Sequence, residues 1–391
     1  MKHLHSKLLK LRTPFIAVSA AVLVLNIISW SLGETPISTL ATALSGSLGT
    51  SYGIGQVLFK ATPLLLAGIA VDLALRVGVF NIGADGQIAV GSLAGTVTAI
   101  SLPASTPPIA AIPLAVLAAA TAGAMWASLA GWMRTRFGAH EVITTIMLNR
   151  IADATVALLM TAWLALPATV RTKDIVRGAA IPRLDTVFRG FAGSAVSWAF
   201  PMSVLVLLGV YWWLAKSRVG REIVWVGYNE RACAAEGIPV ARRKILAMGL
   251  SGAIAGLAMA STVLGYKGYY EIGLGAGVGF GGIAVAFLGG GRPIGLLLAA
   301  LLFGTLAQAG LVINAQVPKE AIGVLEAVVI IAVALASRAA GTETAKAASS
   351  SIAPRTMPQT APTTQAVPTS VVEREKHTAK PSVLTATKDE S

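Results

Sequence analysis

The sequence is poor in the side chains that carry out covalent chemistry. It has one cysteine, Cys233, which excludes an internal disulfide framework and leaves no thiol cluster for a metal ion. The four histidines are scattered, and no nucleophile stands beside a base. The glycine-rich loop followed by Lys and Ser or Thr, which holds ATP phosphates, is missing from the sequence. These absences predict a chain that is not an enzyme and carries no cofactor of its own.

Charged residues are scarce too, at 13% of 391 residues, against roughly a quarter in soluble domains. Apolar residues make up 55%, and the mean hydropathy is +0.72. This composition predicts an all-α integral membrane protein. Windows of about 20 apolar residues predict about ten transmembrane helices, near residues 14–32, 56–75, 83–101, 109–133, 142–166, 199–216, 245–266, 279–291, 293–314 and 320–337. The eighth is too short and glycine-rich to cross unless it begins near Tyr270, so it either spans or re-enters.

Positive charges predict how the chain lies in the membrane. The net charge of +13 comes from Lys and Arg beside apolar runs and not from a basic domain with interleaved aromatic residues, so nucleic acid is not an expected partner. The basic clusters fall on one side if the N-terminus is cytoplasmic. Both termini are then inside, with residues 1–13 as a cytoplasmic N-terminus, 14–337 as the transmembrane domain and 338–391 as a disordered cytoplasmic tail. No small-x-small cleavage site follows the first apolar run, which is expected to remain as a helix.

One loop departs from this charge rule. Residues 167–198 carry five basic and two acidic side chains, yet the helix count places them outside. A basic outer loop would suit docking to an acidic partner. An ordinary solvated loop is the alternative.

A polar, glycine-broken octapeptide, Phe80-Asn-Ile-Gly-Ala-Asp-Gly-Gln87, stands between two apolar runs. Irregular backbone is tolerated inside a bilayer only where protein buries it or where it lines a water-filled path. A charge at mid-bilayer costs roughly 2.5–3.5 kcal/mol, so Asp85 would be expensive in hydrocarbon. The segment therefore points to movement of something polar. The alternative is a short cytoplasmic loop that caps a helix.

Two decapeptides indicate a repeat. Residues 86–95 and 281–290 share six of ten positions, and the helix count makes them run in opposite directions across the membrane. Inverted repeats place a substrate path at their interface, often beside broken helices. Chance similarity among small residues is the alternative.

A short cytoplasmic helix is expected at residues 230–236, within a loop of about 217–244. Asn229 can cap its start, Glu230 suits its first turn, and Gly237 suits the position after its end. A helix this short, isolated between two basic clusters, is marginal alone. It is expected to pack on a separate cytoplasmic subunit or to lie on lipid headgroups.

The chain resembles the permease subunits of bacterial ABC importers for nucleosides, which work with basic-membrane-protein-type lipoprotein receptors, within the wider group of ribose and branched-chain amino-acid permeases. Four blocks carry this resemblance over most of residues 55–337. They are Ala61-Thr-Pro-Leu64 with the octapeptide above, Phe137-Gly-Ala-His-Glu-Val-Ile-Thr-Thr-Ile-Met-Leu-Asn149, Val226-Gly-Tyr-Asn-Glu-Arg-Ala-Cys-Ala-Ala-Glu-Gly-Ile238 running into Leu250-Ser-Gly-Ala-Ile-Ala-Gly256, and Gly279-Phe-Gly-Gly-Ile-Ala-Val-Ala-Phe-Leu-Gly289. The family usually has Glu at Asp85 and often Pro at Glu230, and its pattern does not include the tail.

The resemblance implies a ten-helix fold in a bacterial inner membrane. The implied partners are a cytoplasmic ATPase that binds ATP and Mg, a second permease subunit (a paralogue or a second copy), an extracytoplasmic substrate-binding lipoprotein and membrane lipid. Residues Asn229, Glu230, Arg231, Glu236 and Gly237 would couple to the ATPase.

The same resemblance implies a nucleoside path that involves Asn81, Asp85 and Gln87, with Phe280 available to stack on a base. Bonding of the broken backbone is the alternative role for Asn81 and Asp85. Sugar or branched-chain amino-acid cargo remains open, as do a secondary transporter and a membrane scaffold.

Overall fold

The structure, a computed structural model, describes residues 35–314 without a break, together with scattered residues within 19–33 and 317–332. Over this part of the chain the regular elements are helices, and extended pairing is confined to isolated bridges. The expected first and tenth spans, like both terminal segments, lie largely or wholly outside the described residues. The total of ten helices and the side of the termini therefore stay predictions.

Six helices of the described region are long and apolar enough to cross a membrane, and each falls on an expected span. The chain is thus a multi-pass membrane protein. The six are α3 (Ser51–Arg76), α5 (Pro108–Phe137), α6 (Glu141–Leu159) with a π-helical turn to Leu164, α7 (Ala199–Lys216), α10 (Val240–Gly256) with a π-helical extension to Lys267, and α12 (Pro293–Val312). Expected spans three and eight correspond to α4 (Ala84–Ser101) and the short α11 (Val278–Gly289).

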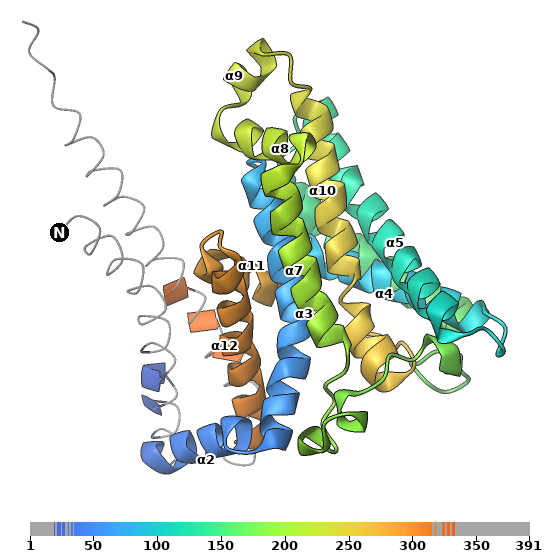
Figure 1. The fold of residues 1–391 in the computed structure, drawn as a ribbon, viewed down its shortest axis with the longest axis vertical. Coiled ribbons are helices and arrows are strands. Elements are labelled where there is room, and N and C mark those ends of the chain that lie inside the picture. The colour runs from blue at the N-terminus through green and yellow to red at the C-terminus, as the bar shows by residue number, and fades with distance from the viewer. Residues whose placement is uncertain are drawn as a thin grey trace, which may run out of the picture. The chain divides into compact units, whose positions relative to one another are not determined.

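Two helices are absent from the expected set. α2 (Pro36–Leu48) has Pro at its first position. It has only 13 residues, fewer than the window of about 20 apolar residues used to predict transmembrane helices. α8 (Arg218–Tyr228) lies between α7 and the short α9 (Glu230–Ala235). It buries Ile223 and Val226 and exposes Arg218 and Arg221, so its pattern is that of a surface helix. In Figure 1, α8 and α9 lie at one end of α3 and α2 at the other.

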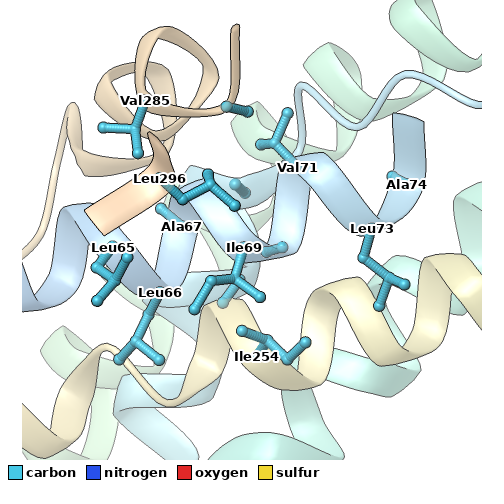
Figure 2. Close-up of a cluster of buried hydrophobic side chains, with 14 of the residues drawn as sticks. Leu65, Leu66, Ala67, Ile69, Val71, Leu73, Ala74, Ile254, Val285 and Leu296 are labelled. Carbon is cyan, nitrogen blue, oxygen red and sulfur yellow. The ribbon is translucent and has the colours of Figure 1, made fainter. Parts of the chain in front are cut away.

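Helix α3 is the centre of the bundle. It contacts α7, α10, α11 and α12, and Leu65, Ile69 and Leu73 on it are buried. Figure 2 shows Val285 of α11 and Leu296 of α12 beside it, with Ile254 of α10 nearby. A helix enclosed in this way has a sequence with apolar residues around its whole circumference and no polar face.

Small residues bring α4, α5 and α10 into close contact. A Cβ atom on Gly123 would lie 2.3 Å from the carbonyl oxygen of Gly252, and one on Gly256 would lie 2.4 Å from that of Ala119. Helices in membranes associate through such close backbone approaches. These glycines therefore serve helix packing.

Candidate translocation site and coupling elbow

The octapeptide folds back into the bundle after α3 ends. Asn81 is fully buried, and its Nδ2 donates to Ser251 Oγ at 2.8 Å. Ser251 Oγ in turn donates to the carbonyl oxygen of Ala70 at 2.6 Å. Ala70 precedes Arg76 by six residues, about 9 Å along the helix. The segment is therefore a re-entrant stretch of buried backbone and not a surface loop.

The side-chain amides of Asn81 and Gln87 form hydrogen bonds with each other in both directions. Asn81 Nδ2 donates to Gln87 Oε1 at 2.9 Å, and Gln87 Nε2 returns a bond of 2.9 Å to Asn81 Oδ1. The same Oδ1 accepts from the backbone NH of Gly83 at 2.9 Å. We call Asn81, Gln87 and Ser251 the amide cluster. Its side chains hold irregular backbone together, the role that the sequence left open beside a path.

Asn149 of α6 secures the same segment from the other side. Its Oδ1 accepts from Gly86 N at 2.9 Å, and its Nδ2 donates to the carbonyl oxygen of Ile82 at 3.0 Å. Sequence reasoning quoted Asn149 only as the last residue of a family block. A polar amide within an apolar span was the signal that could have identified it.

Asp85 joins the starts of two helices. Its Oδ1 accepts from the backbone NH of Gly279, near the start of α11, at 2.6 Å. A Cβ atom at Gly279 would lie 2.4 Å from the backbone nitrogen of Asp85, so the approach requires glycine. Two helix N-termini therefore meet at one carboxylate, which their partial positive charges favour.

The two helices then lead away from this junction. After α11, Gly291 accepts a bond of 2.8 Å from Arg76 Nη2 at the end of α3. α4 leads to the far end of α10, where a Cβ atom on Gly91 would lie 2.8 Å from Gly256 Cα. The two decapeptides of the expected repeat lie in these oppositely directed helices. The inverted repeat of the whole chain stays a prediction.

Two cavities lie beside the junction, and the loop before α11 borders both. The larger, of about 580 Å³, is lined by Phe59, Pro63 and Tyr266 among others. The smaller, of about 320 Å³, is lined by Asp85 and side chains of α6. Phe280, half exposed, borders both. Of the four residues expected on a path, Asp85 and Phe280 reach a cavity, whereas Asn81 and Gln87 line neither of these two.

The basic loop of residues 167–198 packs on the chain that precedes α11. The backbone NH of Thr172 donates to the Tyr270 carbonyl at 2.8 Å, and that of Ile181 donates to the Leu264 carbonyl at 2.8 Å. The guanidinium of Arg171 lies 4.6 Å from the centre of the Tyr269 ring. Part of the loop is thus fixed structure that closes this end of the bundle.

The expected capping of the short helix at residues 230–236 is confirmed. Asn229 Oδ1 accepts from the backbone NH of Ala232 at 3.0 Å, and Gly237 has a φ of +78° after the last turn. The helix, α9, ends at Ala235, one residue before the predicted Glu236, because Glu236 forms its C-terminal cap.

The expectation that this helix is isolated is wrong. Glu230 Oε1 accepts from Lys244 Nζ of α10 at 2.6 Å. α9 also follows α8 directly, and a Cβ atom on Gly227 of α8 would lie 2.0 Å from the Arg76 carbonyl oxygen of α3. We call α8 and α9 the elbow. It is fastened to α3 and α10.

Glu222 makes the second link between the elbow and α10. Its carboxylate accepts from Arg243 Nε at 2.7 Å and from Arg218 Nε at 3.0 Å. The bond from Arg243, with a smaller effect from Arg218, lowers the pKa of the Glu222 carboxyl against the opposing effect of desolvation. The carboxylate therefore stays ionised between two guanidinium groups.

A multi-pass bundle with a re-entrant polar segment and two helix starts meeting inside it has the features of a membrane transport subunit. Residues 53–334 match the family described as "Branched-chain amino acid transport system / permease component", and the chain belongs to this family. It is 33% identical to the guanosine ABC transporter permease protein NupP of Bacillus subtilis (strain 168), over 84% of this chain and 94% of that protein.

Two further relatives widen the comparison. The chain is 31% identical to the nucleoside ABC transporter permease protein NupB of Lactococcus lactis, over 85% of this chain and 93% of that protein. It is also 31% identical to the glucose ABC transporter permease protein TsgB13 of Haloferax volcanii, over 82% of this chain and 86% of that protein. The expected resemblance is confirmed.

The family membership decides the type of transporter. The chain is an ABC transporter permease subunit, a transport component and not an enzyme, and ATP is handled by partner ATPases. ABC transporters of this family generally work with a substrate-binding partner. The secondary-transporter and scaffold alternatives are thereby set aside.

Proposed function

We propose that the chain is a membrane-spanning subunit of an importer that moves nucleosides across a bacterial inner membrane. The observation that carries this proposal is the match to NupP and NupB over most of their length, since both are named for nucleoside transport. Phe280 supports it, because a half-exposed aromatic ring beside two cavities offers a face for a nucleobase.

The proposed complex has three kinds of partner protein. A cytoplasmic ATPase binds ATP and Mg, a second permease subunit completes the membrane domain, and an extracytoplasmic lipoprotein delivers the cargo. Lipid surrounds the spans, the termini lie in the cytoplasm, and residues 338–391 form a tail outside the transmembrane domain 14–337.

We assign coupling to the elbow. Tyr228 is 83% exposed and Trp225 is half exposed, beside the exposed side chains of Arg231 and Glu236. This face offers aromatic and charged contacts to an ATPase. Asn229 and Gly237 set the ends of α9 and so fix which side chains it presents.

Movement of α9 has a direct route into the bundle. The Glu230–Lys244 contact ties α9 to α10, and Ser251, two turns further along α10, bonds Asn81. A shift of α10 would therefore be transmitted to the junction where α4 and α11 meet. We assign Asp85 and Phe280 to the cargo path, and Asn81 and Gln87 to the structure that holds it.

Reconstitution tests the proposal. The chain, its ATPase, second permease subunit and receptor are placed in proteoliposomes, and ATP-dependent uptake of labelled nucleosides, glucose, ribose and leucine is compared. Nucleoside uptake is expected, with none when ATP is left out. A simple sugar is the second candidate cargo, because TsgB13 is named for glucose. Uptake of glucose or ribose alone would contradict the nucleoside assignment and keep the importer.

A further inference from the structure

Helix α6 carries two charged side chains halfway along a membrane span. Arg150 and Asp153 follow Glu141 by nine and twelve residues, about 14 and 18 Å along the helix. The hydrocarbon core is about 30 Å thick, so both residues lie near its centre. We call them the α6 pair. It was not among the residues that the sequence singled out.

The α6 pair points away from the protein interior. The side chains of Arg150 and Asp153 are 82% and 61% exposed, and their closest nitrogen and oxygen atoms are 3.8 Å apart. An exposed ion pair this loose contributes little that would offset desolvation. Against lipid, both charges would be strongly unfavourable. This part of α6 therefore does not face hydrocarbon.

Helix α7 shows what a lipid-facing span looks like in the same chain. Before Lys216 at its end, the large exposed side chains of this helix are all apolar, and they include Leu205, Leu208 and Trp212. Leu205 precedes Lys216 by eleven residues, about 17 Å along the helix, which matches the depth of Asp153. The two helices thus differ in environment at the same depth.

The α6 pair borders the smaller cavity beside the helix junction. Arg150 and Asp153 line it together with Asp85 and Phe280. Arginine supplies several N–H donors, the carboxylates supply acceptors, and the phenylalanine supplies a ring face. Such a set suits a neutral molecule that combines hydroxyl groups with a flat aromatic ring.

We propose that Arg150 and Asp153 line the water-filled translocation path and bind the hydroxyl groups of the cargo, while Phe280 stacks on its ring. This inference rests on the proposed transport of a nucleoside. The α6 pair completes the contact set that Asp85 and Phe280 begin.

Cysteine accessibility in the assembled complex tests the position of the pair. Cys233, buried in the elbow, is first replaced (C233A), and D153C and L205C are compared. Membrane-impermeant thiosulfonates react with thiolates, which form in water and not in hydrocarbon. In proteoliposomes, D153C is expected to react roughly 100-fold faster than L205C, since only its thiol meets water. Modification should abolish the uptake that D153C retains at saturating cargo and leave that of L205C unchanged, and excess cargo should slow the modification of D153C.

Two outcomes would overturn the inference. Equal, slow labelling of both cysteines would place Asp153 against lipid. Labelling of D153C that appears only after detergent separates the subunits would mean that α6 is buried against the second permease subunit. Met147 and Ile151, which are apolar and about half exposed, would then belong to that interface.

The labelling result does not depend on the identity of the cargo. If the complex imports a sugar, the nucleoside proposal fails while fast labelling of D153C, slowed by that sugar, still places the pair on the path. Cargo contact is tested separately by D153N and R150Q, with complex assembly followed by copurification. The KM for uptake should rise about tenfold in each variant, as for loss of a hydrogen bond to a charged group. An unchanged KM in both would refute the contact.

Discussion

The amide cluster and the α6 pair are two polar groups on the helices and re-entrant segment of one bundle, and their environments are opposite: the first is enclosed and the second is exposed. Asn81, Gln87 and Ser251 are at most 1% exposed and bond one another. Arg150 and Asp153 are exposed and only loosely paired. Polar residues in an apolar span are thus of two kinds. Those with matched partners build the scaffold, and those left open to water are available to a ligand.

The most damaging change is expected in the amide cluster. Asn81→Leu removes both directions of its bond with Gln87 and leaves the amide of Gln87 buried without this partner, which costs about 1–3 kcal/mol. The expected result is a lower unfolding temperature of the purified complex and a lower yield in membranes. Asn81→Asp keeps the size of the side chain and removes only the amide donor, so a similar loss of stability in this variant would assign the effect to the lost hydrogen bonds and not to a change of shape. An N81L complex as stable as the wild type would contradict the structural role of the amide cluster.

A smaller effect, confined to transport, is expected at the α6 pair. Arg150→Leu should leave stability unchanged or slightly higher, because no buried group loses a partner, while uptake falls about tenfold at low cargo concentration. Leu205→Ala on α7 is the control and should leave uptake unchanged. Both unfolding temperature and initial uptake rate are measured. Full uptake by R150L would place Arg150 among residues without a role in cargo binding.

The elbow provides a third case, in which one ionic partner is buried and the other is not. Lys244 is 8% exposed and Glu230 is 49% exposed, so Glu230→Gln leaves a buried ammonium without its anion. Coupling should weaken, with ATP-driven uptake reduced roughly three- to tenfold and ATP hydrolysis less responsive to the loaded receptor. Arg242→Gln, an exposed change on α10 outside the elbow, should have a smaller effect. Equal effects of the two changes would count against the Lys244 contact.

The smallest effect concerns pH. Arg243 and Arg218 lower the pKa of Glu222 in the folded protein below its usual 4.5. A lowered folded-state pKa gives stability that is present above the unfolded-state pKa and lost as pH falls through the folded-state value. Stability of the elbow should therefore be level from pH 7 to about 5 and decline below about 4.5. Hydrogen exchange of α8 measures this decline, and E222Q should lack it.

The sequence predicted elements whose signals are local. α7 lies where it was expected, at residues 199–216, because its apolar run ends at Lys216. α9 follows from its Asn229 cap and Gly237. α2 was not predicted because its 13 residues are too few for a transmembrane span. α8 was not predicted because an amphipathic surface helix has no long apolar run.

The candidate site depended on contacts that are distant in the chain. The octapeptide was identified as polar and irregular, but its closure requires Ser251 and Asn149, which are 170 and 63 residues away from their partners. Polarity in a sequence does not show which side chain is enclosed. For that reason Asn81 and Gln87 looked as suited to a path as Asp85, and the α6 pair was passed over. Its signal, two charges within a span, was present in the sequence.

The most direct test of the distinction between sealed and open polar residues is photolabelling of the complete complex with a photoreactive nucleoside analogue, followed by mapping of the modified residues. Labelling at Phe280 and on α6 between residues 146 and 156, prevented by excess nucleoside, is the predicted result. Cargo-protected labelling at Asn81 or Gln87, or on the outer face of α7, would contradict it.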